Sequence, residues 1–263
     1  MRWVAVLVVS AAGVALGAAG LLLLRDDGPK ELLPDLDPAA PTNLEIVQDG
    51  DVYRLVFAAA VDNVGTGPLL VEGERPSRET AAMSARQLVR RTDGSARTRP
   101  VQGGIAYADL GRRSEWRLAG FEVYELRSAP GGQVIQSAEP AGSCLGDRYR
   151  TEGAPPPGRP DRPVWTDECG RDQPDLLVLR EGISQGFGAD FGPGLDGQCV
   201  DVTNVPAGRY VLVHRVNPQR SLEEGDYANN AASLLIQLRR AGSIPSVRVL
   251  ARCPRADTCA PGG

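Results

Sequence analysis

The residues best suited to chemistry lie at the start of one segment, Ala106 to Leu126 (AYADLGRRSEWRLAGFEVYEL). Its second half is apolar and predicts a central strand covered on both faces. Gly120 within it indicates a bulge or a close backbone approach. Charged residues at the start of a buried strand could form a functional site. The simpler interpretation is a cluster of charged side chains that is exposed to solvent. The charged residues are Asp109, Arg112, Arg113, Glu115 and Arg117.

Side chains that bind transition metals or carry an amine are scarce in this chain. The single histidine, His214, lies in the apolar pattern YVLVHRV, and the single lysine is Lys30. A lone histidine inside a strand is more often structural than a ligand, and no C-x-x-C spacing indicates a zinc site. Ser, His and Asp are all present, but no nucleophile elbow accompanies them. We therefore expect no metal site and no catalytic residue.

Oxygen-bearing side chains in the later segments are candidate calcium ligands. They lack the tight alternating pattern of a dedicated calcium loop, so we expect them to act in turns and caps. The residues considered are Asp190, Asp196, Asp201, Asp226, Asn229 and Asn230.

The chain has five cysteines, a number that leaves one outside any set of pairs. Cys144 and Cys169 flank a proline-rich segment and are expected to bridge it. Cys253 and Cys259 are close in sequence and are expected to bridge each other. Cys199 lies in a strand pattern and is expected to be a buried thiol. Disulfides persist outside the cytoplasm, which is where we expect this part of the chain to lie.

The N-terminus carries the clearest targeting signal. Residues 3–24 (WVAVLVVSAAGVALGAAGLLLL) contain no charge and are long enough, at about 1.5 Å per residue, to span a hydrocarbon core of about 30 Å. Arg2 favours a cytoplasmic N-terminus, although Arg25 weakens that bias. We expect a single-pass membrane anchor with the domain outside the cytoplasm. The alternative is a signal peptide cleaved near Ala15-Leu16-Gly17, which would release a secreted protein.

Length and composition favour one large β domain after this segment. The chain has 263 residues, 42% of them hydrophobic, with 31 Gly and 21 Pro, which indicates many turns and few long helices. Its net charge of -4 argues against a general nucleic-acid binder. We expect a transmembrane anchor or signal sequence at 1–25, a proline-containing tether at 26–42 and a β domain at 43–263.

Short strand patterns recur along this domain and predict an all-β, antiparallel β-sandwich. Arg180 to Gly197 is expected to be a glycine-rich loop rather than a strand. The predicted strands are 43–48, 52–61, 69–71, 86–91, 133–137, 176–179, 198–203, 209–216, 232–238 and 246–251.

Several segments resemble, in order, the lysyl oxidase family, and especially its bacterial members. The resemblance covers about Leu33 to Leu238. The segments are LPDL, RLVFAAAVDNVGTGPLLVEG, EWRLAGFEVYELR, GSCLGD, EGISQGFGADFGPGLDGQCVDVTNVPAGRYVLVHRVNP and DYANN. The resemblance implies a lysyl-oxidase-like β-sandwich. The family oxidises primary amines, such as lysine side chains, with copper and a lysine tyrosylquinone cofactor.

The positions that such chemistry requires are replaced in this chain. The three histidines of the family's copper run fall on Arg113, Glu115 and Arg117. The quinone tyrosine falls on Phe191, and the cofactor lysine falls on Pro140. Guanidinium groups cannot lose their charge to bind copper, phenylalanine has no phenol and proline has no side-chain amine. The resemblance therefore implies a scaffold whose copper and quinone residues are gone.

Three functional hypotheses follow. The first is a membrane-anchored, extracytoplasmic lysyl-oxidase-like protein without catalytic activity or cofactor, which acts as a binding or structural module for an envelope protein or glycan. The second is an active copper-dependent amine oxidase with replacement ligands. The third is a generic immunoglobulin-like interaction module, which shares only the sandwich architecture.

Overall fold

The protein is described by a computed structural model that covers residues 28–111, 114–193 and 198–260. Within these ranges the chain forms strands and no helix, and every strand pairing is antiparallel. The all-β, antiparallel prediction is confirmed, and the arrangement is consistent with a β-sandwich. No helix of the described residues is long and apolar enough to cross a membrane. The anchor predicted at residues 3–24 lies outside them.

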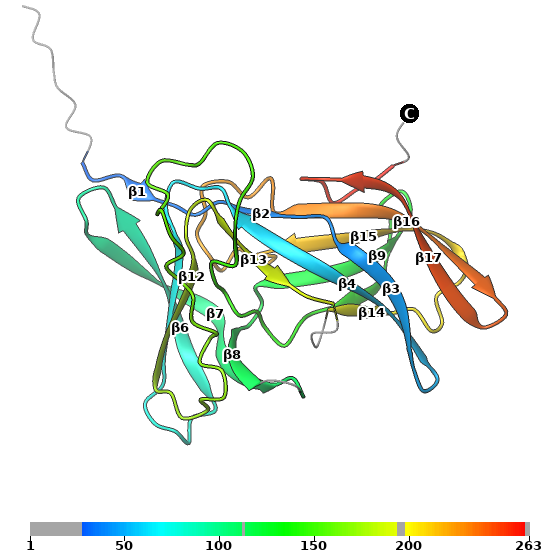
Figure 1. Cartoon of the computed structure of the whole chain (residues 1–263), viewed down its shortest axis with the longest axis horizontal. Coiled ribbons are helices and arrows are strands. Elements are labelled where there is room, and N and C mark those ends of the chain that lie inside the picture. Colours follow the sequence, from blue (N-terminus) through cyan, green and yellow to red (C-terminus); the bar gives the residue numbers. More distant parts are fainter. Residues whose placement is uncertain (1–27, 112–113, 194–197, 261–263) are drawn as a thin grey trace, which may run out of the picture.

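The strands form three sheets, which we name after their central strands. The β6 sheet has the order β12-β5-β6-β7-β8, with β1 paired to β6. Its strands are β1 (Glu31–Leu32), β5 (Leu69–Glu74), β6 (Ala82–Arg91), β7 (Ala96–Asp109), β8 (Ser114–Leu118) and β12 (Val178–Ile183). Figure 1 shows this sheet at one end of the molecule.

The β15 sheet has the order β10-β9-β15-β16-β17 and lies toward the opposite end (Figure 1). Its strands are β9 (Glu122–Ser128), β10 (Val134–Ala138), β15 (Gly208–Val216), β16 (Ala231–Ala241) and β17 (Ile244–Cys253). The β4 sheet has the order β11-β13-β4-β14, with β2 and β3 also paired to β4. Its strands are β2 (Leu36–Pro38), β3 (Thr42–Asp49), β4 (Val52–Asn63), β11 (Tyr149–Arg150), β13 (Phe187–Phe191) and β14 (Cys199–Asp201).

Alternation along β4 explains its central place. Buried and half-buried residues alternate from Leu55 to Asn63, as expected for a strand with one face toward the core. The predicted strands 43–48 and 52–61 form a hairpin in which Asp49 pairs with Val52, and its turn contains Gly50 at a φ of +60°. The buried side of β4 joins one core cluster with residues of all three sheets. Within it the rings of Phe57 and Tyr124 meet edge to face, 4.7 Å apart.

The prediction that Ala106 to Leu126 contains one central strand is wrong. Its residues are divided among β7, β8 and β9, and β9 belongs to a different sheet from β8. Ala119 and Gly120 form a turn, with Gly120 at a φ of +67°. Gly120 therefore marks a change of sheet rather than a bulge, because only this turn redirects an otherwise continuous apolar pattern.

The prediction that Arg180 to Gly197 is a loop is also wrong for its first half. This half contains the end of β12, a turn at Gly186 and β13. An added Cβ at Gly182 would collide with the Leu69 carbonyl oxygen, and one at Gly188 would collide with the Tyr149 ring. These glycines permit close approach between strands. The segment predicted as a tether, 26–42, contributes β1 and β2, and Leu36 is fully buried.

Phe57→Ala is predicted to destabilise the fold strongly, because Phe57 is fully buried and joins the sheets through Tyr124. We expect a loss of about 3–5 kcal/mol in the free energy of unfolding, measured by urea denaturation. The control is Leu250→Ala, which removes a side chain from a residue that is 38% exposed and should cost less than about 0.5 kcal/mol. Equal losses in the two variants would contradict this account of the core.

Candidate functional site

The charged residues of β8 form a buried ion pair. Glu115 and Arg117 lie two positions apart, so their side chains share one face of the strand. They are 1% and 0% exposed, and Arg117 Nη1 lies 3.4 Å from Glu115 Oε1. Arg117 Nε also donates a hydrogen bond of 2.7 Å to the Gly142 carbonyl oxygen. Arg113, the third position of the family's copper run, lies outside the described residues.

This arrangement does not fit copper. The Arg117 guanidinium is held in place by a carboxylate and a carbonyl oxygen, and it cannot be deprotonated to serve as a ligand. The Glu115 carboxylate could in principle bind a metal, but it faces that cation instead. A buried charge without its partner is costly. Glu115 and Arg117 therefore balance each other's charge, at positions where the family resemblance implies copper ligands.

The resemblance assigns the family's quinone to Phe191 and Pro140, which have neither the phenol nor the amine that the quinone requires. Phe191 is the last residue of β13, is 3% exposed and packs edge to face on Phe121 at 6.5 Å between ring centres. Pro140 is buried and lies two residues before Gly142, the hydrogen-bond acceptor of Arg117. Arg117 thus contacts the segment that contains Pro140, and Phe191 contacts the turn that follows β8.

His214 is held inside the protein by both ring nitrogens. On β15, its Nδ1 lies 3.0 Å from the Ala39 carbonyl oxygen and its Nε2 lies 3.1 Å from Glu122 Oε2. The imidazole is fully buried and stacks on Tyr124 at 4.9 Å. Burial raises the pKa of Tyr124 well above its usual range, with Glu122 adding to the effect. A metal at His214 would have to displace one of these partners, so the arrangement matches the predicted structural role.

Glu122 collects further hydrogen bonds that the sequence did not indicate. Its Oε1 accepts from Ser143 Oγ at 2.9 Å and from Gln198 Nε2 at 3.2 Å. Gln198 also reaches the Tyr124 hydroxyl at 2.9 Å. Alternation within β9 could have located Glu122 on a buried face, but its partners come from three other parts of the chain.

A second polar cluster joins the N-terminal strands to the segment after β15. Asn229 Nδ2 donates to Asp35 Oδ1 at 2.7 Å, and Asn230 Nδ2 donates to Glu224 Oε1 at 2.8 Å. Glu224 Oε2 accepts from the Leu36 amide at 2.9 Å. The Oδ1 atoms of Asn229 and Asn230 are buried and have no hydrogen-bond partner among the described residues. These oxygens, with the two carboxylates, could bind a hard cation.

The predicted capping roles are observed for two aspartates. Asp226 Oδ1 accepts from the Ala228 amide at 2.7 Å, and Asp201 Oδ1 accepts from the Thr203 amide at 2.8 Å. Asp190 is an exposed residue of β13, and Asp196 lies outside the described residues. The sequence interpretation missed Asp35 and Glu224. The only signal for Asp35 is that it lies in LPDL, one of the segments that carry the family resemblance, and Glu224 lies two residues before another of them, DYANN.

Both predicted disulfides are confirmed. Cys144 bridges Cys169 and Cys253 bridges Cys259. Cys199, expected to be buried, is instead half-buried in β14, where it pairs with Val56 of β4. The expectation was wrong because β14 is only three residues long, too short to be covered on both faces.

Comparison with known proteins supports the resemblance over the second half of the chain. Residues 177–245 match the family model described as lysyl oxidase. This region includes Phe191, His214 and the polar cluster from Glu224 to Asn230. A stretch of 50 residues is 40% identical to the human protein-lysine 6-oxidase. This stretch makes up 19% of this chain and 12% of the human protein. The chain therefore spans only a small part of that relative, and the two matches show that its second half is similar to lysyl oxidases.

Proposed function

We propose that this chain is a lysyl-oxidase-like binding or structural module that does not oxidise amines. The observation that supports this proposal is the buried Glu115–Arg117 ion pair, which occupies two of the three positions that the resemblance assigns to copper ligands. The environment of His214 supports the same conclusion, because both nitrogens of the single histidine are already engaged. An active oxidase with replacement ligands would need ligands that these side chains do not supply.

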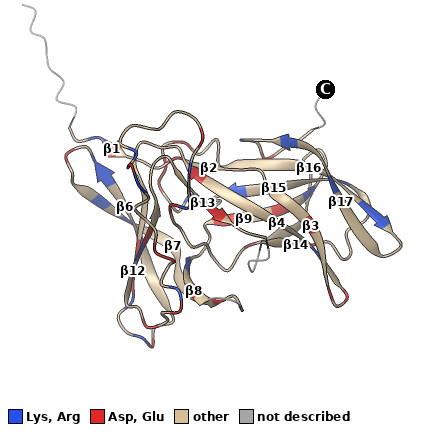
Figure 2. Ribbon diagram, in the orientation of Figure 1, with Lys and Arg blue, Asp and Glu red and all other residues tan. Residues whose placement is uncertain are grey.

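The module is proposed to lie outside the cytoplasm, anchored to the cell membrane by residues 3–24. Two disulfides among the described residues support an oxidising location. An envelope protein or glycan is the proposed partner. Figure 2 shows acidic and basic residues over most of the ribbon, although β16 and β17 carry arginines and no acidic residue. The net charge of -4 still argues against a general nucleic-acid binder. A generic immunoglobulin-like module is less well supported, because the family matches go beyond shared architecture.

The oxidase alternative is tested with the purified full chain, without an added histidine tag, after incubation with Cu²⁺. We expect no stoichiometric copper after dialysis and no peroxide release with simple primary amines, because the scaffold offers no set of three imidazoles. Metal content is measured by mass spectrometry and peroxide by a coupled assay. One copper per chain together with amine turnover and a phenylhydrazine-sensitive quinone absorbance would instead establish an oxidase.

A second candidate function, calcium binding, is favoured by the cluster of Asp35, Glu224, Asn229 and Asn230. Burial raises the pKa of Glu224 to about 7, although hydrogen bonds from Asn217 and Asn230 oppose the effect. Burial also raises the pKa of Asp35, with the negative charge of Asp226 adding to it. A divalent cation would stabilise the ionised form of these carboxylates. It would also give the two buried amide oxygens a partner.

A pocket beside Asp35 and Asn229 leaves room for an ion, although Glu224 and Asn230 do not line it. Asp35, Asp226 and Asn229 line a surface pocket of about 300 Å³ together with Arg255. The Arg255 guanidinium lies at its edge and pairs with Asp37 at 2.7 Å, so its charge is already balanced. Rotating the Asn229 amide by half a turn would direct its oxygen, in place of its nitrogen, toward Asp35.

Glu224 makes a pH dependence testable. Its pKa of about 7 in the folded state exceeds the ordinary value of 4.5, so the folded chain retains a proton that the unfolded chain releases. Stability contributed by this group is therefore fully present below about pH 4.5 and falls as the pH rises toward 7 and above. Thermal unfolding without added cations should show this decline, and Glu224→Gln should reduce it.

Calcium should reverse this decline at pH 8, because it binds the ionised carboxylates. We expect an increase in melting temperature that corresponds to about 2.7 kcal/mol at a calcium concentration 100 times the dissociation constant. The increase should disappear in Glu224→Gln and persist in the matched control Asp201→Asn. An identical calcium effect in wild type and Glu224→Gln would exclude this cluster as the site.

A further inference from the structure

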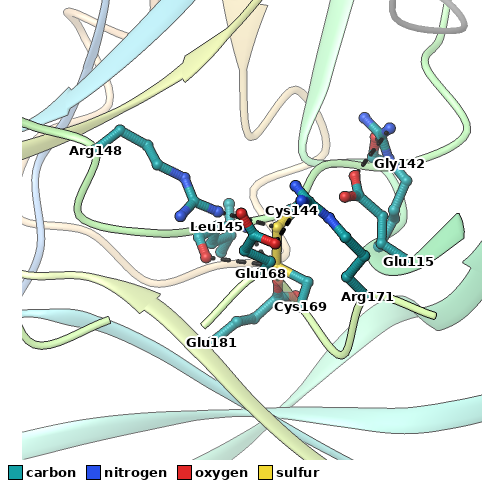
Figure 3. Close-up of a disulfide and its surroundings, with 10 residues drawn as sticks. Glu115, Gly142, Cys144, Leu145, Arg148, Glu168, Cys169, Arg171 and Glu181 are labelled. Carbon is teal, nitrogen blue, oxygen red and sulfur yellow. Dashed lines mark hydrogen bonds and ion pairs between the residues drawn. A yellow bond between two sulfur atoms is a disulfide. The ribbon is translucent and has the colours of Figure 1, made fainter. Parts of the chain in front are cut away.

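The Cys144–Cys169 disulfide is contacted by a different charged or acidic side chain at each sulfur. Arg148 Nη2 lies 3.3 Å from Cys144 Sγ, and Glu181 Oε2 lies 3.2 Å from Cys169 Sγ. Figure 3 shows the two side chains reaching the bridge from different directions. The second disulfide has different surroundings, because Cys259 packs with apolar residues such as Val211 and Leu235.

The position of Arg148 depends on a glycine. The guanidinium folds back over Gly146, where an added Cβ would lie 2.8 Å from Arg148 Cζ. A side chain at residue 146 would therefore push the cation away from the sulfur. A guanidinium next to a cysteine favours the thiolate over the thiol, so Cys144 can leave as a thiolate when a mixed disulfide on its sulfur is broken.

Glu181 provides the opposite environment for Cys169. It lies on β12, is 2% exposed, and its Oε2 accepts a hydrogen bond of 3.0 Å from the Leu145 amide. Its Oε1 is buried without a hydrogen-bond partner among the described residues. Burial raises the pKa of this carboxyl to about 8, so it holds a proton at neutral pH. Burying a carboxyl oxygen without a hydrogen-bond partner costs free energy. A disulfide that served structure alone would gain no stability to offset that cost.

A pocket lies beside the segment that contains Cys169, although neither cysteine lines it. Glu168 and Gly170, the neighbours of Cys169 in sequence, line a pocket of about 760 Å³. Arg171 also lines it and pairs with Glu168 at 2.6 Å, beside the disulfide in Figure 3. Cys144 is 8% exposed and Cys169 is 1% exposed, so Cys144 is the sulfur that an incoming thiolate can reach.

We propose that Cys144–Cys169 is a thiol–disulfide exchange site for a dithiol reductant, with Arg148 and Glu181 as its positioning and proton-donating residues. A thiolate of the reductant attacks Cys144 Sγ, the Cys144–Cys169 bond breaks, and Cys169 leaves with the electron pair and takes the proton of Glu181. The second thiolate of the reductant then attacks the mixed disulfide and releases Cys144 as a thiolate beside Arg148. The protein gains two electrons, and the dithiol becomes a disulfide.

The test follows reduction of each disulfide in the native full chain by dithiothreitol between pH 6 and 9. Alkylation and peptide mass spectrometry report the two bridges separately, so Cys253–Cys259 is an internal reference. We expect Cys144–Cys169 to be reduced first. Its rate constant per dithiothreitol thiolate should fall above about pH 8, where Glu181 loses its proton, and Glu181→Gln should lower it by about 100-fold and abolish this fall. Glutamine still accepts the Leu145 hydrogen bond.

Two further variants separate exchange from loss of structure. Arg148→Gln should slow reduction, whereas Arg150→Gln, whose guanidinium bonds instead to the Asp161 carbonyl oxygen, should not. In Cys169→Ser the remaining Cys144 thiol should react with iodoacetamide with a pKa below about 8.5, and Arg148→Gln should raise that pKa. Reduction of both bridges together only on unfolding, or an unchanged rate and pH profile in Glu181→Gln, would overturn the proposal.

Discussion

Pairing along β4 is the constraint on which the rest of the structure depends. This strand pairs with β2 and β3 on one side and with β13 and β14 on the other. Its buried face contributes Leu55, Phe57 and Val61 to the common core. Because β4 belongs to one sheet and packs on the others through that face, its register also fixes where the ends of β8, β9 and β13 meet.

At that meeting place the protein buries an unusual number of charged and polar groups. Glu115 pairs with Arg117 and Glu122 pairs with His214, whereas Glu181 contacts the disulfide through one oxygen only. Pairs of this kind contribute little net stability compared with apolar residues of similar size. Because a buried charge without its partner is costly, these pairs instead constrain which strands and loops can pack together.

The parts of this structure that follow from local pattern were predictable. The strand pattern at 52–61 identified β4, and a short spacing identified the Cys253–Cys259 bridge. Gly120 and Gly186 were misinterpreted, because the same glycine can serve a bulge, a loop or a turn between sheets. Asp35 and Glu224 were missed for a different reason. They come together only in three dimensions, and each alone is an ordinary acidic residue near a turn.

The early start of the fold also limits where the domain can lie. β1 begins at Glu31, so an anchor that ended at Leu24 would leave only residues 25–30 as a connection, about 20 Å when fully extended. That length is shorter than the domain itself. With such an anchor, the domain would be held close to the membrane surface.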